Sequence, residues 1–481
     1  MRLALVLGVV GHFLALFAPA VLPSLVLAAL DGDTREVTGF AVGGAVIAGL
    51  GLVLARFRVH GAHLLRAEVM AVVALTWLGV GVLGGVPFLL VGFSPIDAAF
   101  ESMSGLTTTG ATVLTDFSAY GRGFFLWRSV LHWLGGLGVI ALFVAILPTL
   151  GIAGRQLFFA EASTASGEAL APRVRRLSGR LWAVYTLLTV VEMSLLLFQG
   201  MPPFDAVCNA MATMSAGGFS PHPASIAGYD LPACEWTIAS FMFLAGANFA
   251  LQWRTLAGRP LAFTRDPEFR VYAAAAAMGT LAIALVLAGG VPGEREFRLA
   301  FFQVASVMSA TGFASADFNL WAEGARSLLV ALMLFGGCAG SAAGGPKVVR
   351  YMLVGKHCRR EMVRTVHPQA VIPVRLGRSP VPEDVVRAVV TFVVVYVATW
   401  FGITIVLTLL GLDLVSALTG TLACLANCGP GLNLLGPMAN YEHLPSASKA
   451  LLVFTMWIGR LEVVTVFALL RPGVLRGIRW R

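Results

Sequence analysis

The segment TTTGATV, Thr107 to Val113, is the polar exception in a chain that is otherwise rich in leucine, valine, alanine and phenylalanine. The chain has 481 residues, of which 58% are hydrophobic and 12% are charged, and its mean hydropathy is +0.83. A soluble domain carries about 25% charged residues, so this composition predicts a membrane protein with several spanning helices. An irregular polar segment at membrane depth lines a cavity or is covered by protein, because lipid offers its backbone no hydrogen bonds. We therefore expect TTTGATV to line or flank such a cavity.

Uncharged runs near the ~20 residues that span a bilayer recur along the chain. Basic residues cluster in alternate links between these runs. By the positive-inside rule these links and both termini are cytoplasmic, so the net charge of +9 reflects topology rather than nucleic-acid binding. A signal peptide is the alternative for the first run, but its apolar part exceeds the roughly 7–15 residues of an h-region. The ten predicted spans are 3–29, 38–55, 68–92, 123–150, 178–200, 236–258, 271–290, 326–354, 386–411 and 447–470.

The TTTG segment has three counterparts at intervals of roughly 100 residues, the sign of an internal repeat. In each one, an alanine stands twelve residues before a glycine, a small residue six before it and a large apolar residue four before it. Each stretch is too short to span a membrane, so we expect a re-entrant pore helix that ends near mid-membrane. The four stretches are DAAFESMSGLTTTG ending at Gly110, DAVCNAMATMSAGG ending at Gly218, LAFFQVASVMSATG ending at Gly312 and SALTGTLACLANCG ending at Gly429.

These patterns predict an all-α polytopic membrane protein. Two N-terminal transmembrane helices precede four units, each made of a helix, a pore helix, a filter loop and a second helix, around one central ion pore. The predicted boundaries are 1–57 for the N-terminal helices, 66–155, 172–260, 268–358 and 384–471 for the four units, and 472–481 for a basic cytoplasmic tail.

Four glycine loops around one axis offer rings of backbone carbonyl oxygens, because glycine places no side chain between the backbone and the axis. Such rings replace the hydration shell of potassium, whereas carboxylate rings suit divalent or less selective cation flow. None of the four glycines has an acidic neighbour, which favours a carbonyl filter. The alternative is that these glycines pack membrane helices together, although packing does not account for the shared pattern before each glycine.

The four loops resemble the filters of the Trk/Ktr/HKT superfamily of potassium transporters. The motifs are TTTGATV, GGF at Gly217–Phe219, TGF at Thr311–Phe313 and NCGPGLN at Asn427–Asn433. GGCAGSAAGGPKVVR, Gly336–Arg350, resembles the intramembrane loop of the third repeat in that family. WIGRLEVVTVF, Trp457–Phe467, resembles the last inner helix with its arginine, and the two extra N-terminal helices point to the TrkH branch.

The resemblance implies a potassium-carrying homodimer with one pore per subunit, in the inner (plasma) membrane of a bacterium. It also implies a cytosolic nucleotide-binding ring of the TrkA type as gating partner, for which the basic stretch 347–387, with Arg359, Arg360 and Arg364, is the expected docking segment. Rubidium should substitute for potassium, lipid is the other expected contact, and no organic cofactor is expected. In plant relatives a serine at the first filter glycine accompanies sodium transport, so Gly110 favours potassium. The implied filter residues, which form the expected metal site, are Thr108, Thr109, Gly110, Ala216, Gly217, Gly218, Ala310, Thr311, Gly312, Asn427, Cys428 and Gly429.

The glycine-rich stretch 336–347 interrupts an apolar helix and is expected to act as a flexible gate below the filter. Helix packing through GxxxG spacing is the alternative. A phosphate loop is rejected, because GSAAGGPK carries an inserted proline and Val348 stands where Ser or Thr is needed. Arg460, expected in mid-helix, is interpreted as a positive barrier that contacts gate-loop carbonyls, with a buried ion pair as the alternative. The predicted gate residues are Gly336, Gly337, Gly340, Ser341, Gly344, Gly345, Lys347 and Arg460.

The expected function is potassium-selective uptake through a gated, channel-like pore. A membrane potential of 100 mV is worth about 2.3 kcal/mol per charge, more than the ~1.4 kcal/mol of a tenfold gradient, so no coupled ion is required. A sodium-permeable or proton-coupled symporter is the alternative, with Glu192 and Glu462 as candidate coupling acids. A membrane-embedded enzyme is a distant alternative, because the histidines show no HExxH or other metal-binding spacing.

Overall fold

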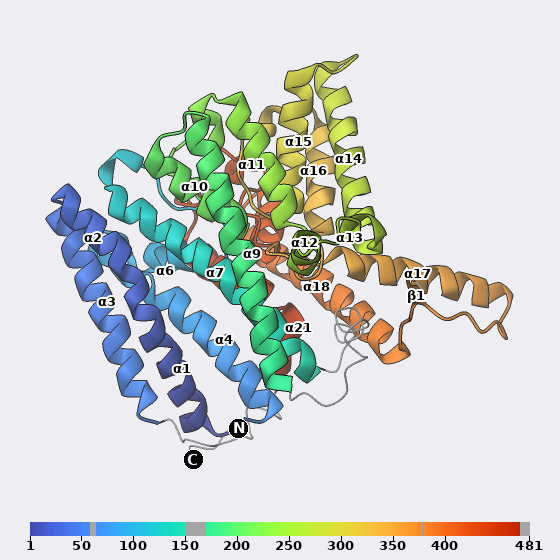
Figure 1. Cartoon of the computed structure of the whole chain (residues 1–481), viewed down its shortest axis with the longest axis horizontal. Coiled ribbons are helices and arrows are strands. Elements are labelled where there is room, and N and C mark those ends of the chain that lie inside the picture. Colours follow the sequence, from blue (N-terminus) through green and yellow to red (C-terminus); the bar gives the residue numbers. More distant parts are fainter. Residues whose placement is uncertain (58–63, 151–169, 378, 472–481) are drawn as a thin grey trace.

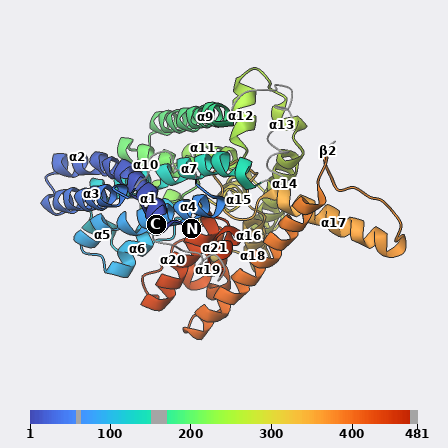
Figure 2. The same ribbon diagram turned by 90° about the horizontal axis from the view of Figure 1, so that it is seen from below.

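The computed structural model of this chain describes residues 1–57, 64–150, 170–377 and 379–471. Helices make up most of this part, and most of them run roughly side by side in one bundle (Figures 1 and 2). The strands within it are one short antiparallel pair, β1 (Arg375–Leu376) and β2 (Ser379–Pro380). The predicted cytoplasmic tail 472–481 lies outside the described residues.

Six helices of the described part are long and apolar enough to cross a membrane, and two sharply bent helix pairs raise that number to eight. This confirms the predicted all-α polytopic class. Two predicted spans are not among the eight. One is α7 (Arg122–Leu150), and the other is α16 (Glu323–Phe335), which stops at the glycine-rich stretch before α17 (Val348–Val366). In both views α17 extends away from the bundle (Figures 1 and 2).

The N-terminal hairpin packs closely because glycines face each other across it. Its first span is α1 (Leu3–Phe17), the turn η1 (Ala18–Val21) and α2 (Leu22–Asp31), and α3 (Thr34–Ala55) returns beside it. A Cβ atom on Gly51 would lie 2.9 Å from the Cα atom of Ala15 and 3.0 Å from the carbonyl oxygen of Gly11. The two helix backbones therefore approach each other at a distance that only glycine permits.

Each of the four aligned stretches is a short helix followed by a loop. The helices have 12, 13, 15 and 12 residues. At 1.5 Å per residue they are about 18–22 Å long, which is less than the ~30 Å hydrocarbon core. These short helices are α6 (Pro95–Leu106), α10 (Pro203–Ser215), α15 (Glu294–Met308) and α19 (Leu414–Leu425).

Further helices and short turns precede, connect and follow these four helices. The remaining elements are α4 (Arg66–Leu83), α5 (Val86–Leu90), η2 (Phe117–Ala119), α9 (Leu170–Phe198), η3 (Ser225–Tyr229), α11 (Pro232–Ala245), α12 (Phe249–Leu256), α13 (Ala262–Arg265), α14 (Pro267–Ala288), η4 (Phe318–Leu320), α18 (Glu383–Leu409), η5 (Asn433–Leu435), α20 (Ser446–Arg460) and α21 (Val463–Leu469).

Two of the helices that follow the loops are broken. The axes of α11 and α12 meet at 105°, and those of α20 and α21 meet at 106°. The prediction that Arg460 lies in mid-helix is therefore wrong, because α20 ends at this residue. Glu462 lies in the break with a φ of 67° and forms an ion pair with Arg350 of α17, a partner far away in sequence. A break at this point exposes backbone groups that must find other partners.

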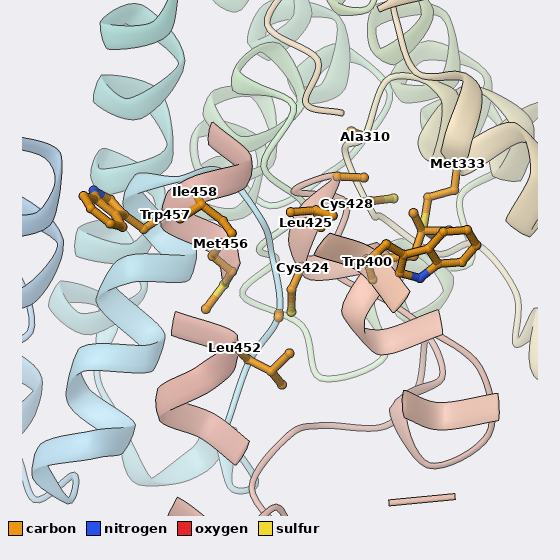
Figure 3. Packing of buried hydrophobic residues seen from close by; sticks show 14 of the residues in the cluster. Ala310, Met333, Trp400, Cys424, Leu425, Cys428, Leu452, Met456, Trp457 and Ile458 are labelled. Atoms are coloured by element: carbon orange, nitrogen blue, oxygen red, sulfur yellow. The ribbon is translucent and has the colours of Figure 1, made fainter. Parts of the chain in front are cut away.

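The largest hydrophobic core contains side chains of α19 and α20, among them Leu425 and Met456 (Figure 3). Trp457 joins α20 to α4, since its indole nitrogen donates a hydrogen bond to the carbonyl of Ala74 at 3.0 Å. Ala310 and Cys428, from two of the aligned loops, belong to the same core. Their side chains are thus buried among apolar groups, which fixes the direction in which the two loop backbones face.

The glycine contact in the N-terminal hairpin predicts a stability difference. We expect Gly51→Val to destabilise the protein by about 1–3 kcal/mol, because the new side chain meets the backbone of α1. Gly49→Val is the matched control, since it lies on the same helix and a Cβ atom there meets nothing within 4 Å. Thermal unfolding in detergent, followed by tryptophan fluorescence, measures both. Equal melting temperatures for the two variants would contradict the close approach of α1 and α3.

Candidate functional site

The four aligned loops share one backbone conformation. The residue two places before each glycine has a left-handed φ, at 51° for Thr108, 58° for Ala216, 57° for Ala310 and 53° for Asn427. The glycines themselves have φ values of 80°, 81°, 82° and 93°. Left-handed φ is uncommon outside glycine, so its recurrence at equivalent positions in all four loops indicates a specific shared geometry.

One hydrogen bond recurs in every loop and explains the small residue six places before the glycine. The backbone N–H that precedes each glycine donates to the carbonyl of that small residue, and the distance is 2.8 Å in all four. The chain thus folds back over the carboxyl end of its own pore helix, where a small side chain leaves room. The four pairs are Thr109 to Ser104, Gly217 to Ala212, Thr311 to Ser306 and Cys428 to Ala423.

The four loops close into a ring. A Cβ atom placed on each loop glycine would collide with the carbonyl oxygen of the residue before the glycine in the next loop. The order of these contacts runs from the first loop to the fourth and returns to the first. The contacts are Gly110 with Gly217, Gly218 with Thr311, Gly312 with Cys428 and Gly429 with Thr109. The predicted filter residues of all four loops are therefore brought together by the fold.

Backbone, rather than side chains, forms the accessible surface of this ring. Gly110, Gly218 and Gly312 are partly exposed, whereas the side chains of the predicted filter residues are buried. The hydroxyl of Thr109 lies 2.7 Å from that of Thr107 and accepts a hydrogen bond from the amide of Asn427 at 3.0 Å. The amide of Asn427 thus links the fourth loop to the first behind the ring, and the partly exposed groups of the ring are backbone groups of its glycines.

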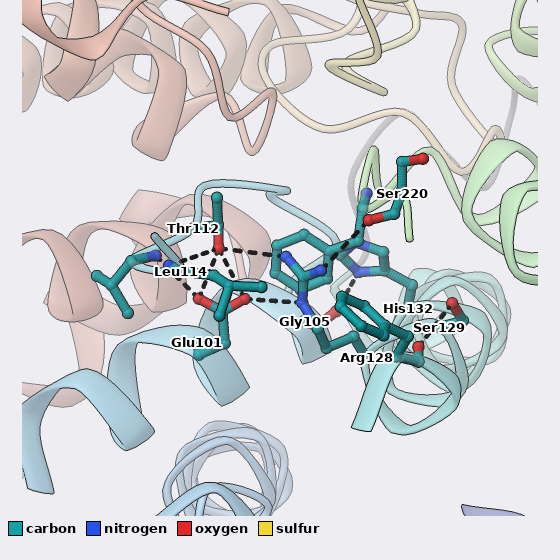
Figure 4. A network of polar contacts seen from close by, with 11 residues as sticks. Glu101, Gly105, Thr112, Leu114, Arg128, Ser129, His132 and Ser220 are labelled. Carbon is teal, nitrogen blue, oxygen red and sulfur yellow. Dashed lines mark hydrogen bonds and ion pairs between the residues drawn. The ribbon is translucent and has the colours of Figure 1, made fainter. Parts of the chain in front are cut away.

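A buried charged network supports the first two loops (Figure 4). Glu101 of α6 forms an ion pair with Arg128 of α7 at 2.8 Å, and both side chains are at most 2% exposed. The same carboxylate accepts hydrogen bonds from the N–H of Val113 at 3.0 Å and the hydroxyl of Thr112 at 2.9 Å. The guanidinium of Arg128 lies 3.8 Å from the centre of the Phe219 ring, just after the second filter glycine. One ion pair thus holds the chain after both glycines.

His132 of α7 explains why the second loop lacks a threonine beside its glycine. Its Nε2 accepts a hydrogen bond from the N–H of Phe219 at 3.2 Å, and its Nδ1 lies 2.6 Å from the carbonyl of Gly105. Since Nε2 accepts, the proton is on Nδ1, which donates to Gly105. A Cβ atom on Gly217 would meet the imidazole ring. Only glycine fits at position 217, so the loop cannot carry threonine there.

Sequence reasoning missed Glu101, Arg128 and His132. A usable signal was present, because all three are ionisable residues in segments expected inside the membrane, where such groups are costly and have specific partners.

The glycine-rich stretch 336–347 forms an irregular loop against the break between α11 and α12. Gly336, Gly340 and Gly345 have left-handed φ values of 69°, 74° and 68°. The carbonyls of Ala245 and Gly246, at the end of α11, accept hydrogen bonds from this loop at 3.1 and 2.9 Å. The N–H at the start of α12 donates back to the carbonyl of Gly340 at 3.1 Å. The loop therefore supplies the partners that the broken helix lacks.

The predicted gate residues meet one another and the fourth filter loop. Arg460 donates a hydrogen bond from Nη1 to the carbonyl of Ala342 at 3.2 Å, while its Nε and Nη2 have no partner among the described residues. A Cβ atom on Gly344 would collide with the carbonyl oxygen of Ala426, two residues before Cys428. Lys347 donates to the carbonyl of Ala343 within the loop. Arg460 thus contacts a loop carbonyl, and no carboxylate of the described residues pairs with it.

Comparisons with known proteins agree with this arrangement. The family model TrkH, described as a cation transport protein, matches residues 72–472. The potassium uptake protein TrkH of Halomonas elongata is 35% identical over 99% of this chain and 100% of its own length. That of Escherichia coli K12 is 37% identical over 85% of this chain and 86% of its own.

The crystal structure of the potassium transporter TrkH from Vibrio parahaemolyticus superimposes with a TM-score of 0.90 and 33% identity, covering all of both chains. These relatives are named as transporters, which confirms a transporter rather than an enzyme. The family match covers most of the chain and the relatives span nearly its whole length. The chain belongs to the TrkH family of cation transport proteins.

Proposed function

We propose that this protein takes up potassium across the inner membrane of a bacterium through a gated pore with a backbone-carbonyl filter. The observation that carries the proposal is the closed ring of four loops with equivalent backbone geometry. Relatives that align over nearly the whole chain are named potassium uptake proteins. The four units 66–155, 172–260, 268–358 and 384–471 would each contribute one loop to the filter.

Potassium fits the ring better than divalent cations do. Rings of carbonyl oxygens replace the hydration shell of an alkali cation, whereas carboxylate rings suit divalent or less selective flow. The carboxylate of Glu101, which contacts the chain just after the first loop glycine, is fully buried and already bound to Arg128, Thr112 and Val113. It supports the loop from behind, so the backbone oxygens remain the groups that would bind the ion.

Arg460 and the loop 336–347 would form the gate. The loop contacts the fourth filter loop through Gly344 and Ala426, so it lies close to the ring. A buried guanidinium with two unpartnered nitrogens among the described residues places positive charge beside the loop. Positive charge raises the barrier for a cation, because desolvated charges interact strongly in a low-dielectric site. Movement of the loop with Arg460 would lower that barrier.

Proton coupling is the second candidate, and Glu192 is the observation that favours it. This side chain of α9 is fully buried, and neither carboxylate oxygen has a hydrogen-bond partner among the described residues. Ionisable groups inside a membrane often belong to proton relays. Glu462 fits less well, because it already pairs with Arg350. A pH-dependent flux that Glu192→Gln abolishes would favour the symporter over the uniporter.

The proposed assembly is a homodimer that a cytosolic nucleotide-binding ring of the TrkA type regulates, with both termini of this chain cytoplasmic. The docking segment 347–387 includes α17, which extends away from the bundle (Figure 1). Arg359 and Arg364 are exposed on this helix. Arg360 is buried and binds Glu383 at 2.6 and 2.8 Å, so we leave it out of the proposed docking residues.

Rubidium uptake into potassium-loaded proteoliposomes tests the filter. We expect external potassium to compete strongly and sodium weakly. Gly110→Ser should reduce the preference for potassium about tenfold, or ~1.4 kcal/mol, because the new Cβ atom displaces the carbonyl of Gly217. Gly200→Ser is the matched control, since Gly200 has a φ of 94° but meets nothing within 4 Å. Equal sodium and potassium competition in the wild type, with no change in Gly110→Ser, would contradict the proposal.

Removal of the charge at Arg460 should increase flux. We expect Arg460→Ala to raise rubidium influx about tenfold at unchanged potassium preference, because the barrier loses its charge and the hydrogen bond to Ala342. Arg460→Lys keeps the charge and should stay near the wild-type rate. Loss of folded protein in Arg460→Ala, with normal flux in the fraction that folds, would favour a purely structural role.

Charge on α17 should determine affinity for the cytosolic ring. We expect the double variant Arg359→Gln/Arg364→Gln to weaken binding of a TrkA-type ring about tenfold, mainly through slower association. Surface plasmon resonance at two salt concentrations measures both rates. Arg295→Gln removes an exposed arginine from the other end of the bundle and serves as control. Equal affinity of all three proteins would exclude this face of α17 as the docking site.

A further inference from the structure

A single carboxylate, that of Glu268, holds both ends of the loop 336–347. Its Oε1 accepts a hydrogen bond from the N–H of Ala339 at 2.7 Å and another from the N–H of Val349 at 3.1 Å. Ala339 lies near the start of the loop, and Val349 is the second residue of α17, just after the loop. The side chain of Glu268 is 8% exposed, so water competes little for these bonds.

The position of Glu268 is fixed by the segment that precedes α14, which lies on the predicted cytoplasmic side. It is the second residue of α14, and Asp266 caps that helix by accepting a hydrogen bond from the N–H of Phe269 at 2.8 Å. The short helix α13 and the link before it connect α14 directly to α12. α12 begins at the helix break that the same loop covers. Glu268 therefore joins the loop to the connection between the second and third units.

The N–H groups of Ala339 and Val349 differ in the hydrogen-bond partners that would remain for them without Glu268. The N–H of Val349 is in the first turn of α17, where no intrahelical acceptor exists, and a carboxylate is favourable at this end of a helix. The N–H of Ala339 is in irregular backbone, where only tertiary contacts can satisfy it. Loss of the carboxylate therefore leaves α17 intact but frees the start of the loop.

We propose that Glu268 is a positioning residue that clamps the loop 336–347 in its closed place, and that the loop must leave this carboxylate at one end to open. This inference rests on the proposed function in one respect, that a closed loop blocks the pore and an open loop does not. The contact of Glu268 with the loop does not depend on that function. Because the carboxylate belongs to α14, movement of the cytoplasmic link 257–266 would move the clamp with it.

Cys338 offers a native reporter of the loop position. Its thiol is free and 1% exposed, and it precedes Ala339 directly. Cys358 is a free thiol exposed on α17 and serves as an internal control. The full-length protein in lipid nanodiscs is treated with N-ethylmaleimide, and peptide mass spectrometry gives the modification rate of each cysteine.

We expect Glu268→Leu to raise the modification rate of Cys338 at least about tenfold, the effect of losing a charge-assisted hydrogen bond, and to leave that of Cys358 unchanged. Glu268→Gln keeps an acceptor oxygen and should stay near the wild-type rate. In proteoliposomes, Glu268→Leu should raise maximal rubidium influx without changing the half-saturating concentration. A role in folding alone would change neither the Cys338 rate of folded protein nor the maximal influx.

An unchanged Cys338 rate in folded Glu268→Leu overturns the clamp, and so does an equal rise in Glu268→Gln. If Glu268→Leu does not fold, Glu268→Ala replaces it, since the smaller side chain also removes the acceptor of both hydrogen bonds. The rate of Cys338 must then rise in Glu268→Ala, and an unchanged rate overturns the clamp. If Cys338 responds as expected but no cation moves through any variant or the wild type, the clamp stands and the proposed function fails.

Discussion

Irregular backbone at membrane depth must find hydrogen-bond partners within the protein, and this constraint organises the whole molecule. In the described part of the chain, regular helix is interrupted where the chain would cross a bilayer by the four aligned loops, by the loop 336–347 and by the breaks after α11 and α20. Each aligned loop solves the problem locally, because the N–H before its glycine binds a carbonyl of its own pore helix. The loop 336–347 solves it at long range, through the broken end of α11, Arg460 and Glu268. An aligned loop needs only its own pore helix, so the same arrangement can occur four times. The loop 336–347 needs contacts from α11, α14 and α20 together.

The aligned loops and the loop 336–347 are held by different kinds of contact. Behind the first two aligned loops lie a buried ion pair, an imidazole with both nitrogens bound and an arginine stacked on Phe219. Removing one partner of a buried ion pair is costly, so this network resists rearrangement. The loop 336–347 is rich in glycine and alanine and is held mainly by backbone hydrogen bonds. Elements with few packed side chains open at lower free energy than elements held by buried side-chain networks. The supports of the first two aligned loops and of the loop 336–347 therefore differ in kind.

Local chemistry explains how much could be predicted from the sequence. The register of the four loops was predictable, because a turn over the end of a helix requires a small residue at one place and glycine at another. The meeting of Arg460 with a loop carbonyl followed from the cost of a buried charge. The break after Arg460, the pairing of Glu462 with Arg350, and the roles of Glu101, His132 and Glu268 were not predicted. All of these depend on contacts between residues far apart in the chain, and such contacts leave no spacing pattern in one sequence.

The differences between the four units increase with distance from the ring. At the ring, glycine and carbonyl geometry is equivalent in all four loops, because an ion on the axis would require like distances from each. One layer behind it, the supports already differ, with His132 behind the second loop and the amide of Asn427 bridging the fourth to the first. Farther along the chain the units differ more, since α11 and α20 break at similar angles, α16 ends in the glycine-rich loop and α7 continues to Leu150. Symmetry is thus kept at the ring, where a common ligand on the axis would constrain all four loops, and lost in the helices that follow, where no such constraint acts.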